Sequence, residues 1–312
     1  MKPEILLIGP MMPHVMAALD ARYTVHKLYE AADRDACVRE VGGAVRGIGT
    51  SGHLGAGAAL MDALPKLEII SCYGVGVDAI DLAHAAKRGV IVTNTPDVLN
   101  DDVANMAVGL VLATSRCMMM GDRHVRSGAW LNGDPPLARS IRGRTVGILG
   151  LGRIGKDIAR KLAVFGCKIV YHGRHEQSGQ SYAYYADLVA MARDSDYLIV
   201  ICPGGDATRH IVNRAVLDAL GPEGTLINVA RGSVVDEDAL VAALLEGRLG
   251  GAGLDVFEDE PRVPDALFPL DNVVLQPHQG SATTETRRAM GDLVVDNLAA
   301  HFDGKPVLTP VR

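Results

Sequence analysis

Three glycines in the arrangement Gly150-x-Gly152-x-x-Gly155 constrain the fold of this chain more than any other feature. The first of them ends a short apolar run, TVGILG, and the three open a segment with helical periodicity that ends at Gly166. In such a strand–turn–helix unit the first glycine permits a tight turn, the second lets the backbone approach a pyrophosphate, and the third lets helix and strand pack closely. The phosphates would lie at the helix N-terminus, where backbone amides and the helix dipole favour negative charge. With the next apolar run, CKIVYH, the pattern predicts a dinucleotide-binding βαβ unit.

Arg174 indicates which dinucleotide this unit accepts. It lies 19 residues after Gly155 (174 − 155), close to the position roughly 20 residues on where the ribose-reading residue is expected. An acidic side chain there accepts a hydrogen bond from a 2′-hydroxyl and repels a 2′-phosphate, whereas a guanidinium offers a planar fork to phosphate oxygens. Such a charged hydrogen bond is worth about 1–3 kcal/mol, or roughly 5- to 150-fold in preference. We therefore expect NADP (NADPH) as the cofactor; the alternative is that Arg174 is a solvated surface charge without a ligand.

Short apolar runs alternate with helical segments along the whole chain. Before residue 100 the runs are EILLIG, YTVHKLY, AVRGIGT, LEIISCY and VIVTNT, with helical segments such as LMDALPK and DLAHAAKRG between them. This alternation is typical of a parallel sheet covered by helices. A second series begins at TVGILG, after a stretch rich in Pro, Gly and Arg at residues 131–144. Because 312 residues are too many for one core of ordinary size, we expect an α/β fold with two doubly wound parallel-sheet domains.

The domain boundaries follow from two helical segments. A long helical stretch from Asn100 to Ser127 is expected to join the domains, with Asn100, Asp101 and Asp102 available to cap its N-terminal amides. A last amphipathic helix, from about Arg287, would return the chain to the first domain. We therefore expect residues 1–98 and 287–312 to form one domain and residues 99–286 to form the dinucleotide-binding (Rossmann) domain.

Charge and cysteine content argue against several other classes of protein. A net charge of −6 without a block of like charges provides no basic surface for nucleic acid or an anionic membrane. The five cysteines contain no Cys-x-x-Cys pair, so we expect reduced thiols, a cytoplasmic protein and no metal site. The start, MKPEILLIGP, is interpreted as a β-strand and not a signal peptide, and the longest apolar stretch, from Met106, is interrupted by Arg116 and too short to span a bilayer.

Three later segments place polar side chains after consecutive predicted strands. GTLINVARG contains Arg231, GGAGLDVFEDEP contains Glu260, and NVVLQPHQG contains His278. Each motif alone is more often a turn or a structural residue, but the carboxyl ends of parallel strands share one edge, where ligands bind. We therefore expect these three side chains to converge beside the nicotinamide.

The roles follow from what reduction of a 2-keto acid requires when the cofactor supplies the hydride. Arg231 can bind the carboxylate and the carbonyl through its guanidinium fork. His278 can donate a proton to the forming alkoxide as general acid. Glu260, hydrogen-bonded to the other ring nitrogen, would fix the tautomer and favour the imidazolium form. Asp255 could accept a hydrogen bond from the nicotinamide amide.

Together these segments resemble the D-isomer-specific 2-hydroxyacid dehydrogenase family, and within it the NADP-preferring glyoxylate, hydroxypyruvate and hydroxyphenylpyruvate reductases. The resemblance is carried by GVGVDAIDL, VTNTPDVLNDDVANMAVGL, GILGLGRIG, INVARGSVVDEDAL, GGAGLDVFEDEP, VVLQPHQGSAT and HFDGKPVLTPV, from about residue 70 to the C-terminus. It implies a Rossmann domain inserted into a flavodoxin-like substrate domain, a catalytic trio matching Arg231, Glu260 and His278, and a homodimer.

The resemblance also implies binding residues for substrate and cofactor. Backbone amides of the loop Tyr73-Gly74-Val75-Gly76 would face the substrate carboxylate, and loops near Ser51, His53 and Tyr73 would set the pocket size. The dimer segment matches the stretch around Arg126 and Trp130, where Trp130 either enters the partner's site or packs at the interface. The cofactor site would comprise Gly150, Gly152, Arg153, Ile154, Gly155, Gly173, Arg174, Cys202, Pro203, Thr208, Val229, Asp255 and Gly280.

The chain departs from the family pattern at three places. Gly173 stands where relatives often carry a hydroxyl residue, so Arg174 and Arg153 must provide more of the phosphate contact. GGDAT follows Cys202-Pro203 in place of a leucine-containing loop, and Gln279 follows His278 where an apolar residue is common. Cys202 is interpreted as a loop thiol and not a nucleophile.

Two alternatives to an NADPH-dependent reductase remain open. An NAD-dependent enzyme of the phosphoglycerate type would need an acid where Arg174 stands and further basic groups for a substrate phosphate. A non-catalytic, nucleotide-sensing regulator could use the same fold, because a fold alone does not determine function. The sequence does not rank glyoxylate, hydroxypyruvate and bulkier aryl keto acids as substrates.

Overall fold

The computed structural model describes residues 2–311, which form two compact units. Unit 1 comprises Met1–Leu99 and Thr283–Arg312, and unit 2 comprises Asn100–Ala282. The chain thus leaves unit 1 after residue 99 and returns at residue 283, whereas the sequence analysis placed these boundaries after residues 98 and 286.

Unit 1 is built on a five-stranded sheet of order β2-β1-β3-β4-β5, in which every pair is parallel. This is the flavodoxin-like strand order that the resemblance implies. Its strands are β1 (Glu4–Leu7), β2 (Thr24–Lys27), β3 (Val45–Ser51), β4 (Ile69–Tyr73) and β5 (Ile91–Thr93). Its helices are α1 (Pro13–Arg22), α2 (Arg34–Val41), α3 (Ala58–Asp62), α4 (Leu82–Lys87) and α11 (Thr284–Phe302), with a 3-10 turn, η1 (Leu28–Glu30).

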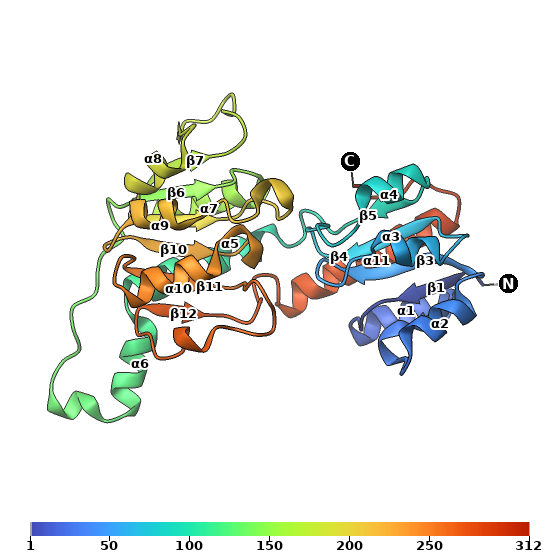
Figure 1. Cartoon of the computed structure of the whole chain (residues 1–312), viewed down its shortest axis with the longest axis horizontal. Helices are drawn as coiled ribbons and strands as arrows, with labels where there is room; N and C mark the ends of the chain where they lie inside the picture. Colours follow the sequence, from blue (N-terminus) through green and yellow to red (C-terminus); the bar gives the residue numbers. More distant parts are fainter. Residues whose placement is uncertain (1, 312) are drawn as a thin grey trace. The chain divides into compact units, whose positions relative to one another are not determined.

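Alternate residues of β1, together with Ile8 directly after it, fill the cores on the two faces of the unit 1 sheet. Ile5 and Leu7 pack with α1 and α11, whereas Leu6 and Ile8 pack with the residues of α2, α3 and α4. All four side chains are buried, because successive residues of a strand point to opposite faces and this sheet is covered on both. The C-terminal helix α11 therefore lies against β4 and α1, far from them in sequence (Figure 1).

Unit 2 is built on a seven-stranded sheet of order β12-β11-β10-β9-β6-β7-β8, again with parallel pairing throughout. The order β8-β7-β6-β9-β10-β11 is the 3-2-1-4-5-6 order of the Rossmann fold, with β12 added at the edge. The strands are β6 (Thr145–Leu149), β7 (Lys168–His172), β8 (Ala183–Tyr184), β9 (Tyr197–Val200), β10 (Thr225–Asn228), β11 (Gly251–Leu254) and β12 (Val273–Leu275).

Helices cover both faces of the unit 2 sheet. Those that pack on it are α5 (Asn100–Ser115) and α7 (Arg153–Val164) on one face, and α8 (Leu188–Arg193), α9 (Arg214–Leu220) and α10 (Glu237–Leu245) on the other (Figure 1). Short 3-10 turns are η2 (Ala129–Asn132), η3 (Asp206–Thr208), η4 (Gly232–Val234) and η5 (Asp265–Leu267). Side-chain caps define several helix starts: Asp187, Asn213 and Asp236 each accept a hydrogen bond from a first-turn amide.

The prediction of one helix from Asn100 to Ser127 was wrong. The helix ends at Ser115, and α6 (Met118–Arg126) starts after a bend of 59°. Cys117 adopts a left-handed conformation (φ 49°), and the hydroxyl of Thr114 donates to the carbonyl of Leu110 within the last turn of α5. A left-handed residue interrupts the helical hydrogen-bond ladder, which a pattern of apolar residues does not reveal.

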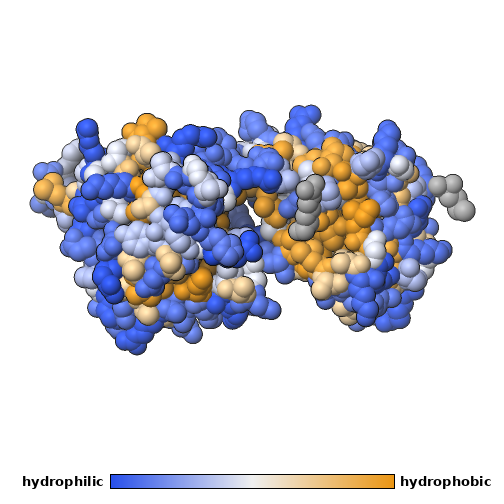
Figure 2. All heavy atoms as spheres, turned by 90° about the horizontal axis from the view of Figure 1, so that it is seen from above, coloured by the Kyte–Doolittle hydropathy of each residue, from blue (hydrophilic) through white to orange (hydrophobic). Residues whose placement is uncertain are grey.

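No single helix within residues 2–311 is long and apolar enough to cross a bilayer, although α5 and α6 together reach that length and composition. The apolar residues of α5 instead pack against β10 and β11 in the core of unit 2. Figure 2 shows hydrophobic residues gathered on one face of unit 1, on the right of the view, while hydrophilic residues dominate the visible face of unit 2.

Candidate active site

The glycine turn between β6 and α7 has the close packing and the open space that the sequence predicts. Gly150 has a positive φ of 103°, and a Cβ there would lie 2.7 Å from the backbone nitrogen of Cys202. At Gly155 a Cβ would lie 2.2 Å from the carbonyl oxygen of Gly150, whereas at Gly152 it would meet nothing within 4 Å. Gly152 caps α7 without a side chain, and no acid lies in the first turn of the helix. The helix N-terminus therefore faces space that suits a pyrophosphate.

Arg174 lies beyond the end of β7, in an exposed loop. Among the residues that the structure describes, its guanidinium makes no hydrogen bond or ion pair. A Cβ at the preceding Gly173 would meet nothing within 4 Å, so the missing side chain leaves open space beside the arginine. Arg153, the expected second phosphate contact, is the first residue of α7.

The loop after β9 contains the residues expected on the adenine side. The side chain of Cys202 is only 9% exposed, and burial raises the pKa of its thiol to about 11. The thiol is therefore protonated at neutral pH, in agreement with its interpretation as a loop thiol and not a nucleophile. The Thr208 hydroxyl donates to the carbonyl of Pro203 at 2.7 Å and so closes the GGDAT loop on itself.

Arg231 follows β10, and a buried asparagine shapes its loop. Asn228 is 1% exposed; its side-chain oxygen accepts from the amide of Ala230 at 3.1 Å, and its side-chain nitrogen donates to the carbonyl of Arg231 at 3.0 Å. The oxygen and the nitrogen of the Asn228 side chain therefore both hold the backbone at the end of β10. The sequence analysis did not single out Asn228, although a polar residue at the end of a buried strand was the available signal.

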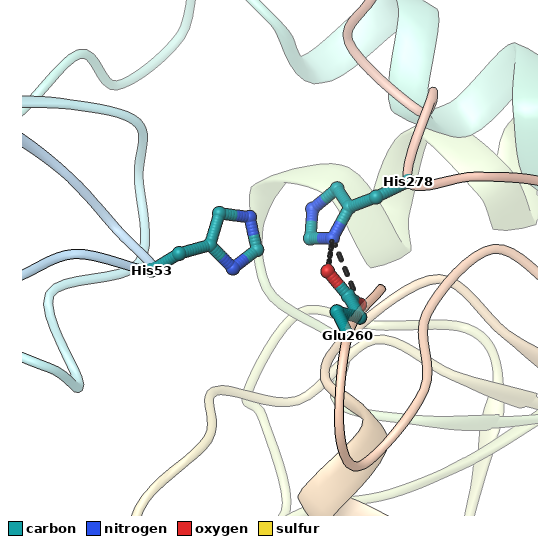
Figure 3. Close-up of side chains that lie close together, drawn as sticks. All are labelled: His53, Glu260 and His278. Carbon is teal, nitrogen blue, oxygen red and sulfur yellow. Dashed lines mark hydrogen bonds and ion pairs between the residues drawn. The ribbon is translucent and has the colours of Figure 1, made fainter. Parts of the chain in front are cut away.

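His278 and Glu260 form a hydrogen-bonded pair beyond β12 and β11 (Figure 3). The Nδ1 atom of His278 lies 2.9 Å and 3.1 Å from the two carboxylate oxygens of Glu260. Because an ionised carboxylate only accepts hydrogen bonds, the proton is on Nδ1, and Nε2 is left for chemistry. Both side chains are about one quarter exposed. Glu260 also accepts from the amide of Phe257 at 3.1 Å, which orients the carboxylate.

Asp255 holds the loop that carries His278. It is 2% exposed, and its two oxygens accept from the amides of Gln279 at 2.7 Å and Gly280 at 2.8 Å. Burial raises the pKa of this carboxyl, and the two amides oppose that rise. The amide of His278 donates to the Asp255 carbonyl at 2.9 Å, while His278 itself has a positive φ of 52°. This strained conformation is held by the aspartate, a role the sequence analysis did not assign. Contact of Asp255 with a nicotinamide amide stays a prediction.

In unit 1, the expected carboxylate-binding loop follows β4. The amide of Gly74 donates to the Thr95 hydroxyl at 3.1 Å, and the Asn94 side chain donates to the Val75 carbonyl at 2.9 Å. The amides of Val75 and Gly76 donate to no acceptor within residues 2–311. The loop is thus held through its other polar groups, and two adjacent amides are left for an anion.

Tyr73 connects this loop to the start of α11. Its hydroxyl donates to the carbonyl of Arg287 at 2.7 Å, and the Arg287 guanidinium carbon lies 5.7 Å from its ring centroid. Ser51 pairs with Tyr73 across β3 and β4, and both line a small pocket with Met11 and Leu54. The sequence analysis named Arg287 only as the approximate start of the last helix and not as a neighbour of this loop, because an arginine near a helix start carries no distinctive local signal.

A family model, similar proteins and a similar solved structure all assign this chain to one family. The family model described as D-isomer specific 2-hydroxyacid dehydrogenase, NAD binding domain, matches residues 108–280. A hydroxyphenylpyruvate reductase of Plectranthus scutellarioides is 51% identical over 98% of both chains, and a glyoxylate/hydroxypyruvate reductase of Arabidopsis thaliana is 48% identical over 98% of both.

A solved structure is similar over nearly the whole length. It is the NADPH-dependent glyoxylate/hydroxypyruvate reductase of Sinorhizobium meliloti in complex with NADP and malonate, which is 48% identical, with a TM-score of 0.92 over 100% of this chain and 97% of the other. Both units, the glycine turn and the strand-end residues described above therefore lie within the matched region. The chain belongs to the D-isomer specific 2-hydroxyacid dehydrogenase family.

Proposed function

We propose that this protein is an NADPH-dependent reductase that converts small 2-keto acids into D-2-hydroxy acids. The observation that carries the proposal is the hydrogen-bonded pair of His278 and Glu260 at the carboxyl edge of the unit 2 sheet. The Arg231 loop and the glycine turn lie at the same edge, because β6, β10, β11 and β12 are parallel strands of one sheet. A positioned proton donor, a guanidinium and a dinucleotide turn are the groups that this reaction requires.

We assign cofactor binding to the glycine turn between β6 and α7 and to the loop after β7. The amides at the start of α7 bind the pyrophosphate, and the open position at Gly152 supports this. Arg174 binds the 2′-phosphate, with Arg153 as a second cation. The bound cofactor supplies the hydride. The absence of an acid in the first turn of α7 fits an anionic ligand.

The proton is held on His278. Its Nδ1–H donates to Glu260, so Nε2 faces the reacting oxygen and transfers its proton as negative charge develops there. Glu260 stabilises the imidazolium that carries this proton, and the amide of Phe257 prevents the carboxylate from turning away.

The substrate is held by its carboxylate. Arg231 binds a carboxylate and a neighbouring carbonyl oxygen through two nitrogens of one planar group. In unit 1 the adjacent amides of Val75 and Gly76 are a second group of donors that suits a carboxylate. Glyoxylate, hydroxypyruvate and hydroxyphenylpyruvate are the substrates to test first, since they appear in the names of the similar reductases.

We also propose a cytoplasmic homodimer. Large apolar side chains are exposed on α6 and the segment after it: Val125 57%, Trp130 60%, Leu131 92% and Leu137 100%. Several large exposed apolar side chains in one short segment favour a protein partner. No disulfide joins any of the five cysteines, all of which lie within residues 2–311, and this supports a reducing compartment. Light scattering of the purified protein at micromolar concentration tests the dimer, and a monomeric mass would contradict it.

A substrate panel with both cofactors tests the reductase. We expect kcat/KM for glyoxylate or hydroxypyruvate to be higher with NADPH than with NADH, by roughly 5- to 150-fold. Equal or better kcat/KM with NADH would overturn the cofactor assignment but not the reductase. Absence of turnover with every keto acid and both cofactors would favour the non-catalytic alternative.

A further inference from the structure

The loop that carries Arg174 is tied down by a glutamine. This loop, residues 173–182, connects β7 to β8. The backbone amide of Gln177 donates to the hydroxyl of Tyr171 at 2.8 Å, and its side-chain nitrogen donates to the carbonyl of Leu151, also at 2.8 Å. Leu151 lies between Gly150 and Gly152, so one side chain connects the Arg174 loop to the glycine turn.

Both acceptors of the Gln177 bonds are themselves fixed. Tyr171 is 1% exposed in the core of unit 2, and its ring centroid lies 5.4 Å from that of Tyr184 on β8. The Tyr184 hydroxyl donates to the carbonyl of Gly173 at 3.2 Å, which holds the loop at its start. Leu151 is 2% exposed. The glutamine therefore joins two rigid parts of the unit.

Beyond Gly173, the rest of the loop has no such side-chain attachment. Within residues 174–180, which the structure describes in full, Gln177 is the one residue whose side chain forms a hydrogen bond. Arg174, His175 and Glu176 are exposed, and Gly179 has a positive φ of 79°. Without Gln177 the arginine would sit on a loop with many conformations, and binding of a phosphate would have to order it.

We propose that Gln177 is a positioning residue that sets the preference for a 2′-phosphorylated nucleotide, by holding the Arg174 loop at a fixed place relative to the pyrophosphate turn. The proposal rests on the assignment of NADPH above. It also accounts for Gly173, which stands where relatives often carry a hydroxyl residue. A loop that is ordered before the cofactor binds needs fewer side-chain contacts to the phosphate. Gln177 acts through Arg174 and touches neither substrate nor reacting atoms.

The test separates phosphate recognition from catalysis. Gln177→Met keeps the length of the side chain and removes the donor to Leu151. Binding of adenosine 2′,5′-bisphosphate and of 5′-AMP to the intact protein is measured by calorimetry. We expect about tenfold weaker binding of the bisphosphate, as for loss of one hydrogen bond, with 5′-AMP binding within about twofold of the unmodified protein. In turnover, KM for NADPH should rise by a similar factor, while KM for NADH and kcat stay unchanged.

Two further variants make the result specific. Gln180→Met changes a half-buried glutamine of the same loop whose side chain has no hydrogen bond within the described residues, and it should leave both affinities unchanged. Tyr171→Phe removes the acceptor of the Gln177 amide and keeps the ring, and it should weaken the bisphosphate selectively. It also serves as the test should Gln177→Met fail to fold, as judged by its thermal transition.

Equal weakening of both nucleotides, or no change in either, would overturn the role of Gln177 while leaving the reductase intact. If the unmodified protein binds the bisphosphate no better than 5′-AMP, the NADPH assignment fails and the proposal for Gln177 fails with it.

Discussion

The two sheets of this protein share a doubly wound design but differ at their first crossover. In unit 2, β6 enters α7 through Gly150 and Gly152, with a backbone so close that a Cβ at Gly150 would meet the backbone of Cys202. In unit 1, β1 enters α1 through GPMMPH, and a Cβ at Gly9 would meet only the side chain of Leu54 within 3 Å. The same type of strand-to-helix connection is therefore a tight glycine turn in one unit and an ordinary loop in the other.

Each unit also contains a His–Glu pair with the same N···O distance, through Nδ1 of His278 and through Nε2 of His301, and the two pairs have different surroundings. His278 and Glu260 lie 2.9 Å apart at the carboxyl edge of the unit 2 sheet, and His301 and Glu68 lie 2.9 Å apart in unit 1. Glu68 is also held by Arg46, whose guanidinium lowers the pKa of that carboxyl. The comparison shows that a pair becomes a candidate for catalysis through its place at the sheet edge that also carries the nucleotide turn, and not through its N···O distance alone.

The largest expected effect separates these two pairs. His278→Ala should lower kcat by on the order of 10²- to 10⁴-fold, because the proton donor is removed, while NADPH binding measured by fluorescence titration stays unchanged. His301→Ala, the matched control, should leave kcat within about twofold. Retained turnover in His278→Ala would remove the general-acid role.

The second prediction separates the two crossovers. Gly150→Ala should destabilise unit 2 by about 2–3 kcal/mol or more and abolish nucleotide binding, because the alanine has a positive φ and a backbone clash. Gly9→Ala should cost less than about 1 kcal/mol, because Leu54 is 49% exposed and its side chain can move. Both are measured by denaturant unfolding, and similar costs at the two glycines would contradict the comparison.

The third prediction concerns Arg174, the positive charge that follows the first crossover of unit 2. Arg174→Ala should reduce the preference for NADPH over NADH by roughly ten- to a hundredfold, mainly through KM for NADPH. Arg160→Ala, which removes an exposed arginine of α7 that pairs with Asp157, is the control and should keep the preference. An unchanged ratio in Arg174→Ala would return Arg174 to a solvated surface charge.

The smallest effect is expected at Cys202, against which the turn packs. Alkylation requires a thiolate, and the thiol pKa of about 11 leaves a very small thiolate fraction at pH 8. Iodoacetamide at pH 8 should therefore label the half-buried Cys37 and Cys117 before Cys202. Mass spectrometry of the folded protein checks the order, and early labelling of Cys202 would show that the turn opens in solution.

Much of the fold could be predicted from local pattern. The apolar runs became β1, β3, β4, β6 and β7 because strand propensity and burial on both faces point to the same structure. The break between α5 and α6 could not be predicted, because no glycine or proline between Ser115 and Met118 marks the left-handed backbone of Cys117 that ends the helix. The helix start at Thr283 was missed by a few residues, although its hydroxyl accepts a hydrogen bond from the Thr286 amide.

The sequence by itself determined which chemical groups are available for binding and catalysis. Spacing along one chain is enough to identify a glycine turn, an arginine 19 residues beyond it, and an arginine, a glutamate and a histidine after successive strands. Only the tertiary structure decided how these groups are held. The contacts that hold them join residues 18 to 26 positions apart. They are the bonds of the Glu260 carboxylate to Nδ1 of His278, of Asp255 to the amides of Gln279 and Gly280, and of Gln177 to the carbonyl of Leu151. Such contacts depend on the parallel strands that bring loop ends together, and no local pattern encodes them.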